Sequence, residues 1–197
     1  MKPSETTKPH LIIMVGIPCS GKSFFAEHFA ETFKAPIVSY DHLRKQIFSN
    51  PTFTEDENDI IKKVSDHVLS EVLKTKKTVI FEGQTGLRSE RFDIEKKARG
   101  AGYEPLLIWV QTETLAAQKR ATKSSLEKPS LTIDEFNAKL KKFSAPNKNE
   151  KVIVISGKHT YASQLKIVLK HLIQPHAETD EQKNMTRTPK NRSFLIR

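Results

Sequence analysis

The chain has 197 residues, 37% of them hydrophobic, which supports one good core and excludes two full domains. Its single cysteine, Cys19, excludes a disulfide framework and a cysteine zinc cluster, and no apolar run is long enough to span a membrane. The net charge of +10 favours a nucleic acid or another polyanion as partner about as strongly as it favours a lysine-rich soluble surface.

The beginning of the chain predicts a strand, a glycine loop and a helix in direct succession. After a loose arm at residues 1–9, residues 11–15 form an unbroken apolar run of the kind that a doubly covered parallel strand needs. Residues 16–23 fit the pattern G-x-x-x-x-G-K-[ST]. A helical pattern follows, with one apolar face made by Phe25, Ala26, Phe29, Ala30 and Phe33.

This order favours a phosphate-binding loop, because backbone N–H groups at a helix start suit a polyphosphate. Lys22 is expected to reach the β- and γ-phosphates, and the Ser23 hydroxyl to be a Mg²⁺ ligand. Cys19 falls at a spacer position. The residues predicted to bind the nucleotide here are Gly16, Pro18, Ser20, Gly21, Lys22 and Ser23.

Strands and helices alternate through the middle of the chain. We expect strands at residues 36–40, 78–81 and 105–110, and helices at 41–48, 89–99 and 113–121. A longer helix is expected to begin at Thr54, capped together with Glu57. Its predicted apolar face consists of Ile60, Ile61, Val64, Val68, Leu69, Val72 and Leu73.

The last third of the chain completes the pattern. A polar segment at 122–129 precedes a short helix at 132–143, a fifth strand at 152–155 and a last helix at 161–173. The alternation predicts an α/β P-loop NTPase fold, a three-layer sandwich with a five-stranded parallel sheet. We expect one domain over residues 10–174, with a small helical lid at about 122–146 and a disordered basic tail at 175–197.

Ligands of an open parallel sheet bind beyond the carboxyl ends of its strands, so residues at those ends are the site candidates. Asp41 could take a proton from an attacking hydroxyl, and Arg44 could hold an anionic substrate group. The alternative for Asp41 is a helix N-cap, with Arg44 in solvent. Glu82 could hold Mg²⁺ through water, or be a cap or core-edge carboxylate.

Further candidates follow the third and fourth strands. Gln84 and Thr85 come directly after Glu82 and could reach the substrate. In the polar segment, Arg120 and Lys123 could close over the phosphates of the nucleotide, or be plain surface residues.

Taken together, the loop 16–23, the motif Asp41-x-x-Arg44 and the strand leading through Glu82 to Arg91 resemble the P-loop kinases of the polynucleotide 5′-hydroxyl kinase and zeta-toxin-like group. The resemblance covers about residues 10–173 and includes the stretch 143–146 before the fifth strand. It implies a kinase that uses ATP and Mg²⁺.

The resemblance also implies roles for single residues. Asp41 would be the general base, Arg44 the contact to a neighbouring substrate phosphate, Arg91 a further substrate contact, and Arg120 a contact to the ATP phosphates. The chain departs from the group after the third strand, where it has Glu82, Gln84 and Thr85. It also has Lys123 where a second lid arginine is expected, and lysine lacks the bidentate fork of arginine.

Our first functional hypothesis is therefore transfer of the γ-phosphoryl group of ATP to an acceptor hydroxyl, with Lys22, Asp41 and Arg120 as catalytic residues. The 5′-hydroxyl of a polynucleotide is the favoured acceptor, and a nucleoside, sugar or nucleotide sugar is the rival. A nucleotide-binding ATPase without an acceptor is a third hypothesis. The sequence gives no oligomeric state and indicates neither a signal region nor a membrane partner, so we expect a cytoplasmic enzyme.

Overall fold

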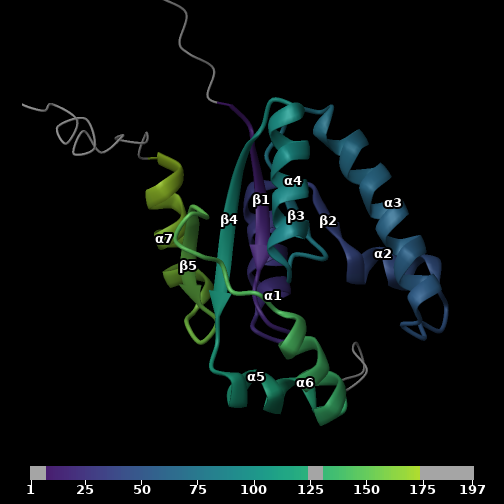
Figure 1. The fold of residues 1–197 in the computed structure, drawn as a ribbon. Coiled ribbons are helices and arrows are strands. Elements are labelled where there is room, and N and C mark those ends of the chain that lie inside the picture. Colours follow the sequence, from purple (N-terminus) through teal and green to yellow (C-terminus); the bar gives the residue numbers. More distant parts are fainter. Residues whose placement is uncertain (1–7, 124–130, 174–197) are drawn as a thin grey trace, which may run out of the picture.

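The computed structural model describes residues 8–123 and 131–173, which form one twisted sheet covered by helices (Figure 1). All strand pairs are parallel, in the order β2-β3-β1-β4-β5. The predicted α/β fold with five parallel strands is confirmed. The strands are β1 (His10–Val15), β2 (Ile37–Ser39), β3 (Val79–Glu82), β4 (Glu104–Gln111) and β5 (Val152–Ser156).

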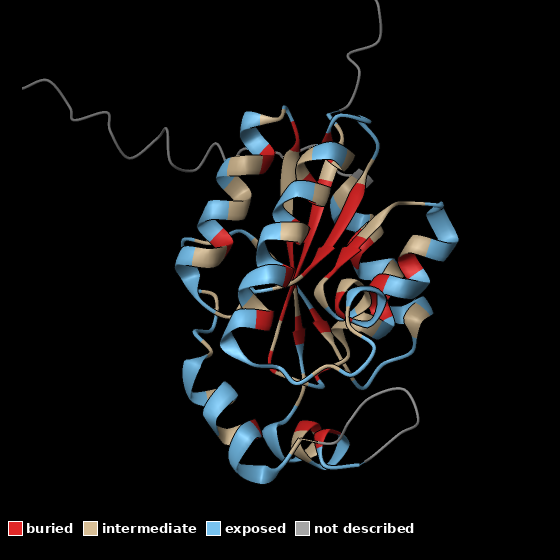
Figure 2. Ribbon diagram, turned by 90° about the vertical axis from the view of Figure 1, so that its right-hand side faces the viewer, coloured by how far each residue is buried: buried red, intermediate tan, exposed pale blue. Residues whose placement is uncertain are grey.

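Helices cover both faces of the sheet, as its continuous apolar strands require. On one face, α1 (Lys22–Phe33) and α7 (Tyr161–Ile173) pack on a core that includes Ile12, Met14 and Ile108. On the other face, α3 (Glu55–Leu73) and α4 (Arg88–Gly100) pack on a core that includes Leu11, Ile13 and Phe81. Alternate side chains of β1 therefore point into two different cores. The strands are the most deeply buried of the described elements (Figure 2).

A third, smaller cluster lies beyond the carboxyl ends of the strands. There α5 (Thr114–Ala121) and α6 (Ile133–Lys142) enclose Phe136, which packs with Ala117, Ala121 and Ile17 of the glycine loop. The helix α6 begins at a capping box in which Thr132 and Glu135 exchange hydrogen bonds. The α5–α6 pair thus stands beside the loop at 16–23 as a separate small layer (Figure 1).

The helix boundaries agree with the predicted ones to within a few residues, but three details differ. The N-cap of α2 (Tyr40–Ile47) is Ser39, so the alternative in which Asp41 caps this helix is wrong. Ile60 and Phe33, predicted on apolar faces, are 45% and 46% exposed. Ile60 lies in the second turn of α3. Phe33 is the last residue of α1, and its ring packs on that of Phe29 with the centroids 4.4 Å apart.

Some sequence predictions fall on residues that the structure does not describe. These are most of the arm at 1–9, the tail at 175–197, and residues 124–130 of the region expected to be a lid. Among the described helices, none combines the length and the apolar character that crossing a bilayer would require.

The structure differs from the sequence prediction at Arg91, which was expected to contact substrate. Its side chain is 0% exposed, and its guanidinium donates to both carboxylate oxygens of Glu150, at 2.6 and 3.1 Å. It also donates to the carbonyl oxygens of Thr85, Gly86 and Ser144. Arg91 therefore ties the segment before β5 to the beginning of α4, and it is a structural residue.

Replacing this buried guanidinium should destabilise the fold strongly. We expect Arg91→Ala to lower the free energy of unfolding by about 3–5 kcal/mol, because it leaves Glu150 as a buried carboxylate without its cation. Arg99→Ala is the matched control, since Arg99 forms an exposed i,i+4 pair with Glu95, and it should cost less than about 1 kcal/mol. Chemical denaturation measures both, and equal losses would contradict the structural role of Arg91.

Candidate active site

The loop between β1 and α1 turns back on itself before the helix begins. Its backbone has positive φ at Gly16 (+150°), Cys19 (+56°) and Gly21 (+107°), and Ser20 N–H donates to the Ile17 carbonyl at 3.2 Å. A Cβ at Gly16 would lie 2.7 Å from the Val110 carbonyl oxygen, so this position accepts glycine alone. The loop thus forms a turn of backbone amides at the start of a helix, the arrangement that suits phosphate.

The ends of β4 and β5 hold this loop in place. The Thr112 hydroxyl donates to the Ser20 carbonyl at 2.8 Å. Gly157, which follows β5, packs so closely that a Cβ there would collide with the same Ser20 carbonyl and with the Thr112 hydroxyl. Sequence reasoning missed both Thr112 and Gly157. Position could have indicated them, since each lies two residues after the end of a predicted strand and directly after the observed one.

Two side chains of the loop take up positions suited to nucleotide binding. The Lys22 ammonium lies over the loop itself and donates to the carbonyl oxygens of Gly16 and Ile17, at 3.0 and 2.9 Å. The Ser23 hydroxyl donates to Glu82 Oε1 at 2.6 Å. The two residues predicted as metal ligands, which are 59 positions apart in the sequence, are therefore in direct contact.

Glu82 also contacts the neighbouring strand β2, and so links the glycine loop to the residues that follow β2. Ser39 pairs with Glu82 across β2 and β3, and its hydroxyl lies 3.4 Å from Glu82 Oε2. Two residues later, Asp41 lies exposed in the first turn of α2. The carboxylate of Asp41 therefore belongs to the same edge of the sheet as the glycine loop.

Arg44, in contrast, is occupied by other protein groups. Its side chain is 7% exposed, lies 2.9 Å from Glu57 and 2.6 Å from Asn58 Oδ1, and stacks on the ring of Phe53 at 4.8 Å. Glu57 also accepts hydrogen bonds from Thr52 and Phe53. Burial raises the pKa of Glu57, but the bonds from Arg44 and from these neighbours outweigh it and hold that pKa below its ordinary value.

The residues after β3 divide into one exposed and one buried side chain. Gln84 is exposed at the carboxyl edge of the sheet. Thr85 is 3% exposed and donates its hydroxyl hydrogen to the Met14 carbonyl at 2.7 Å, so it supports β1. The expectation that Thr85 reaches the substrate is not met, because its hydroxyl points into the protein.

The cations expected in the lid lie on α5 and directly after it. Arg120 is exposed and donates to the Gly157 carbonyl at 3.2 Å, which places its guanidinium beside the segment that holds the loop. Lys123 is exposed, two residues beyond the end of α5. Arg120 thus contacts the residue that follows β5, at one end of the strand order, whereas Asp41 follows β2 at the other end.

A sequence model of the AAA domain family AAA_33 matches residues 11–146. The chain belongs to this family. The match includes the glycine loop, Asp41, Glu82 and Arg120, and it ends before β5. A search of curated protein sequences finds no significant match.

Solved structures with a similar fold include several kinases. The APS kinase CysC of Mycobacterium tuberculosis, in complex with AMPPNP and APS, is 17% identical with a TM-score of 0.64, over 86% of this chain and all of that one. A gluconokinase from Sinorhizobium meliloti 1021 is 16% identical with a TM-score of 0.59, over 92% of this chain and all of that one.

An RNA repair complex, Pnkp1/Rnl/Hen1, also contains a similar chain. The match is 22% identical with a TM-score of 0.60, and it covers 72% of this chain and 46% of that one. At these identities the comparisons show the fold, which is that of the P-loop kinases.

The close contact at Gly157 generates a testable prediction about the loop. Gly157→Ala should force the Ser20 carbonyl to move, and overpacking of this kind costs about 1–3 kcal/mol. We therefore expect the Kd for an ATP analogue, measured by calorimetry, to rise about tenfold or more. Gly100→Ala is the control, because no atom lies within 4 Å of a Cβ at Gly100. An unchanged Kd in Gly157→Ala would contradict the account of the loop.

Proposed function

We propose that the protein is an ATP-dependent kinase that transfers the γ-phosphoryl group to an acceptor hydroxyl, with the 5′-hydroxyl of a polynucleotide as the first acceptor. The proposal depends above all on Glu82, whose carboxylate contacts Ser23 at the start of α1 and Ser39 directly before α2. This carboxylate brings the phosphate loop and the beginning of α2, where Asp41 lies, to one place.

The nucleotide half of the site consists of the loop 16–23 and the cations beside it. The loop amides and Lys22 hold the phosphates, and Arg120 and Lys123 approach from α5. In this proposal residues 10–174 are the kinase domain, and α6 belongs to the lid of about residues 122–146. Fixed positive groups of this kind stabilise the charge that spreads over the transferred phosphoryl group.

The contact between Ser23 and Glu82 fits a magnesium ion. A hydroxyl and a carboxylate oxygen 2.6 Å apart are hard oxygen donors, and Mg²⁺ in phosphate sites takes one or two protein ligands and keeps several waters. Ser23 would hold the ion directly and Glu82 through water. When bound, Mg²⁺ neutralises part of the negative charge on the β- and γ-phosphates.

The acceptor half of the site consists of Asp41 and the exposed edge after β3. Asp41 accepts the proton of the acceptor hydroxyl as its oxygen attacks the γ-phosphorus, while the bond from that phosphorus to the bridging oxygen breaks and ADP leaves. Gln84, exposed at the same edge, is available to bind the acceptor.

Two observations bear on the class of acceptor. The charge of +10 favours a polynucleotide. The engagement of Arg44 by Glu57 and Asn58 favours a small acceptor without a neighbouring phosphate, since this arginine was the expected phosphate contact. A small-molecule kinase is therefore the second candidate, and the similar gluconokinase and APS kinase structures agree with it.

Substitutions at Lys22 and Asp41 test the two halves separately. We expect Lys22→Ala to abolish ATP turnover, because it removes the charge at the β- and γ-phosphates. Asp41→Asn should leave the Kd for ATP unchanged and slow phosphoryl transfer by about 10²–10⁴-fold, the usual contribution of a general base. Calorimetry gives the Kd for ATP, and transfer of labelled phosphate from ATP to DNA, RNA, nucleosides and sugars gives the activity of each variant.

Asp59→Asn, which changes an exposed carboxylate on α3, is the matched control and should transfer at the wild-type rate. Full transfer activity in Asp41→Asn would eliminate Asp41 as the base. Transfer to sugars or nucleosides but to no polynucleotide would replace the first candidate by the second.

A further inference from the structure

The positive charge of the protein is concentrated in the last third of the described chain. Residues 8–118 contain fifteen basic and fifteen acidic side chains, so their net charge is zero. The described residues from 119 to 173 contain eleven basic and three acidic side chains, which leaves +8. All eleven of these Lys and Arg residues are exposed. The positive excess of the described residues therefore belongs to the elements from the end of α5 to α7.

Part of this charge lies on residues 143–151, which connect α6 to β5 and which we call the crossing segment (Figure 1). Ser144 N–H donates to the Gly86 carbonyl at 2.8 Å, and Ser144 and Glu150 both accept from the buried Arg91. The crossing segment therefore starts beside the loop after β3, where Gln84 marks the acceptor edge. Its two cations, Lys148 and Lys151, are both exposed.

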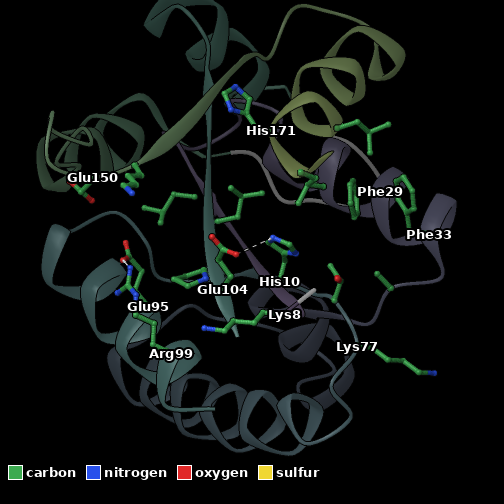
Figure 3. Close-up of a pocket in the computed structure, with 18 of the residues that line it drawn as sticks. Lys8, His10, Phe29, Phe33, Lys77, Glu95, Arg99, Glu104, Glu150 and His171 are labelled. Atoms are coloured by element: carbon green, nitrogen blue, oxygen red, sulfur yellow. Dashed lines mark hydrogen bonds and ion pairs between the residues drawn. The ribbon is translucent and has the colours of Figure 1, made fainter. Parts of the chain in front are cut away.

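The crossing segment leads to a large hollow at the opposite edge of the sheet (Figure 3). β5 pairs with β4 only from Leu107 onward, so within the described part of the chain no β-strand lies beside the first residues of β4 on that side. The hollow has a volume of about 1360 Å³, which exceeds the roughly 300–1,000 Å³ of ordinary small-molecule sites.

One face of α4 forms a wall of this hollow. Arg88, Phe92, Glu95 and Arg99 line it at helical spacings of four, three and four residues. Phe92 is 60% exposed, more than any other phenylalanine among the described residues. Figure 3 shows Glu95 and Arg99 on one side of the hollow, opposite the aromatic rings of α1.

The acidic side chains that line the hollow are already engaged by other protein groups. Glu95 pairs with Arg99 and Glu150 with Arg91, each at 2.6 Å, and Glu104 lies 3.7 Å from His10. The other charged residues of the lining are cations: Lys8, Lys34, Lys77, Arg88 and Lys151. The lining as a whole therefore carries six Lys and Arg side chains against three carboxylates.

We propose that the crossing segment and this face of α4 bind a single-stranded nucleic acid, with phosphates on Arg88, Lys148 and Lys151 and one base stacked on Phe92. Cations along a groove together with an exposed aromatic ring are the means by which proteins hold single strands without reading their sequence. We call the crossing segment and this face of α4 together the path. The inference rests on the proposed function, because the path begins at the acceptor edge and would bind the nucleotides that follow the 5′ end.

Direct binding tests the proposal independently of catalysis. A fluorescently labelled single-stranded RNA of 20 nucleotides is titrated with the full-length protein without ATP, and anisotropy gives the Kd. We expect Phe92→Ala to raise the Kd about tenfold, since stacking of one base contributes about 1–3 kcal/mol. In Arg88→Ala/Lys151→Ala the slope of log K against log salt should become shallower by about 1.4, because two phosphate contacts are lost.

Lys62→Ala/Lys63→Ala is the control, since it removes two exposed lysines from α3, away from the path, and it should bind RNA like the wild type. Unfolding curves check that each variant is folded. The proposal would be overturned if Phe92→Ala and Arg88→Ala/Lys151→Ala both kept the Kd and the salt slope of the wild type. It would also be overturned if the wild type did not bind RNA, or if it bound polyglutamate instead of RNA.

Transfer assays with the wild type separate this inference from the proposed function. If RNA binding depends on Phe92 but no polynucleotide is phosphorylated, the nucleic-acid surface stands and the proposed acceptor is wrong. If RNA is phosphorylated but the path variants transfer to a long and a two-nucleotide acceptor in the same ratio as the wild type, the path is wrong and the kinase proposal stands.

Discussion

The site depends on the carboxylate of Glu82 and its two hydrogen bonds, from Ser23 of the glycine loop and from Ser39 of β2. In a parallel sheet the carboxyl ends of all strands meet at one edge, so residues far apart in sequence can converge there. Here β1 supplies the loop, β3 the carboxylate and β2 the approach to Asp41. In the proposed function, that strand order places the nucleotide and the acceptor on the two sides of Glu82.

A second constraint is the buried guanidinium of Arg91. It joins the loop after β3, the beginning of α4 and the crossing segment through five hydrogen bonds. The start of the crossing segment, at Ser144, is thereby held next to the loop after β3, although it lies much later in the sequence. The same arginine links the stability of the fold to the placement of the cations that we propose bind nucleic acid.

Local pattern sufficed to predict the five strands, the glycine loop and the Thr54 cap, because these depend on residues within a few positions of one another. Local pattern could not show that Arg44, Thr85 and Arg91 are structural residues, because this depends on which groups their side chains contact in the folded protein. The partners are Glu57 and Asn58 for Arg44, Met14 for Thr85, and Glu150 for Arg91. The last two contacts join residues 71 and 59 positions apart.

The most direct test of the account measures ADP release and labelled phosphate in the acceptor within one reaction, with and without a 5′-hydroxyl oligonucleotide. The account predicts that ADP release depends on the acceptor and that each ADP is matched by one phosphate on its 5′ end. ADP released at the same rate without any acceptor, with no phosphate on the oligonucleotide, would contradict it.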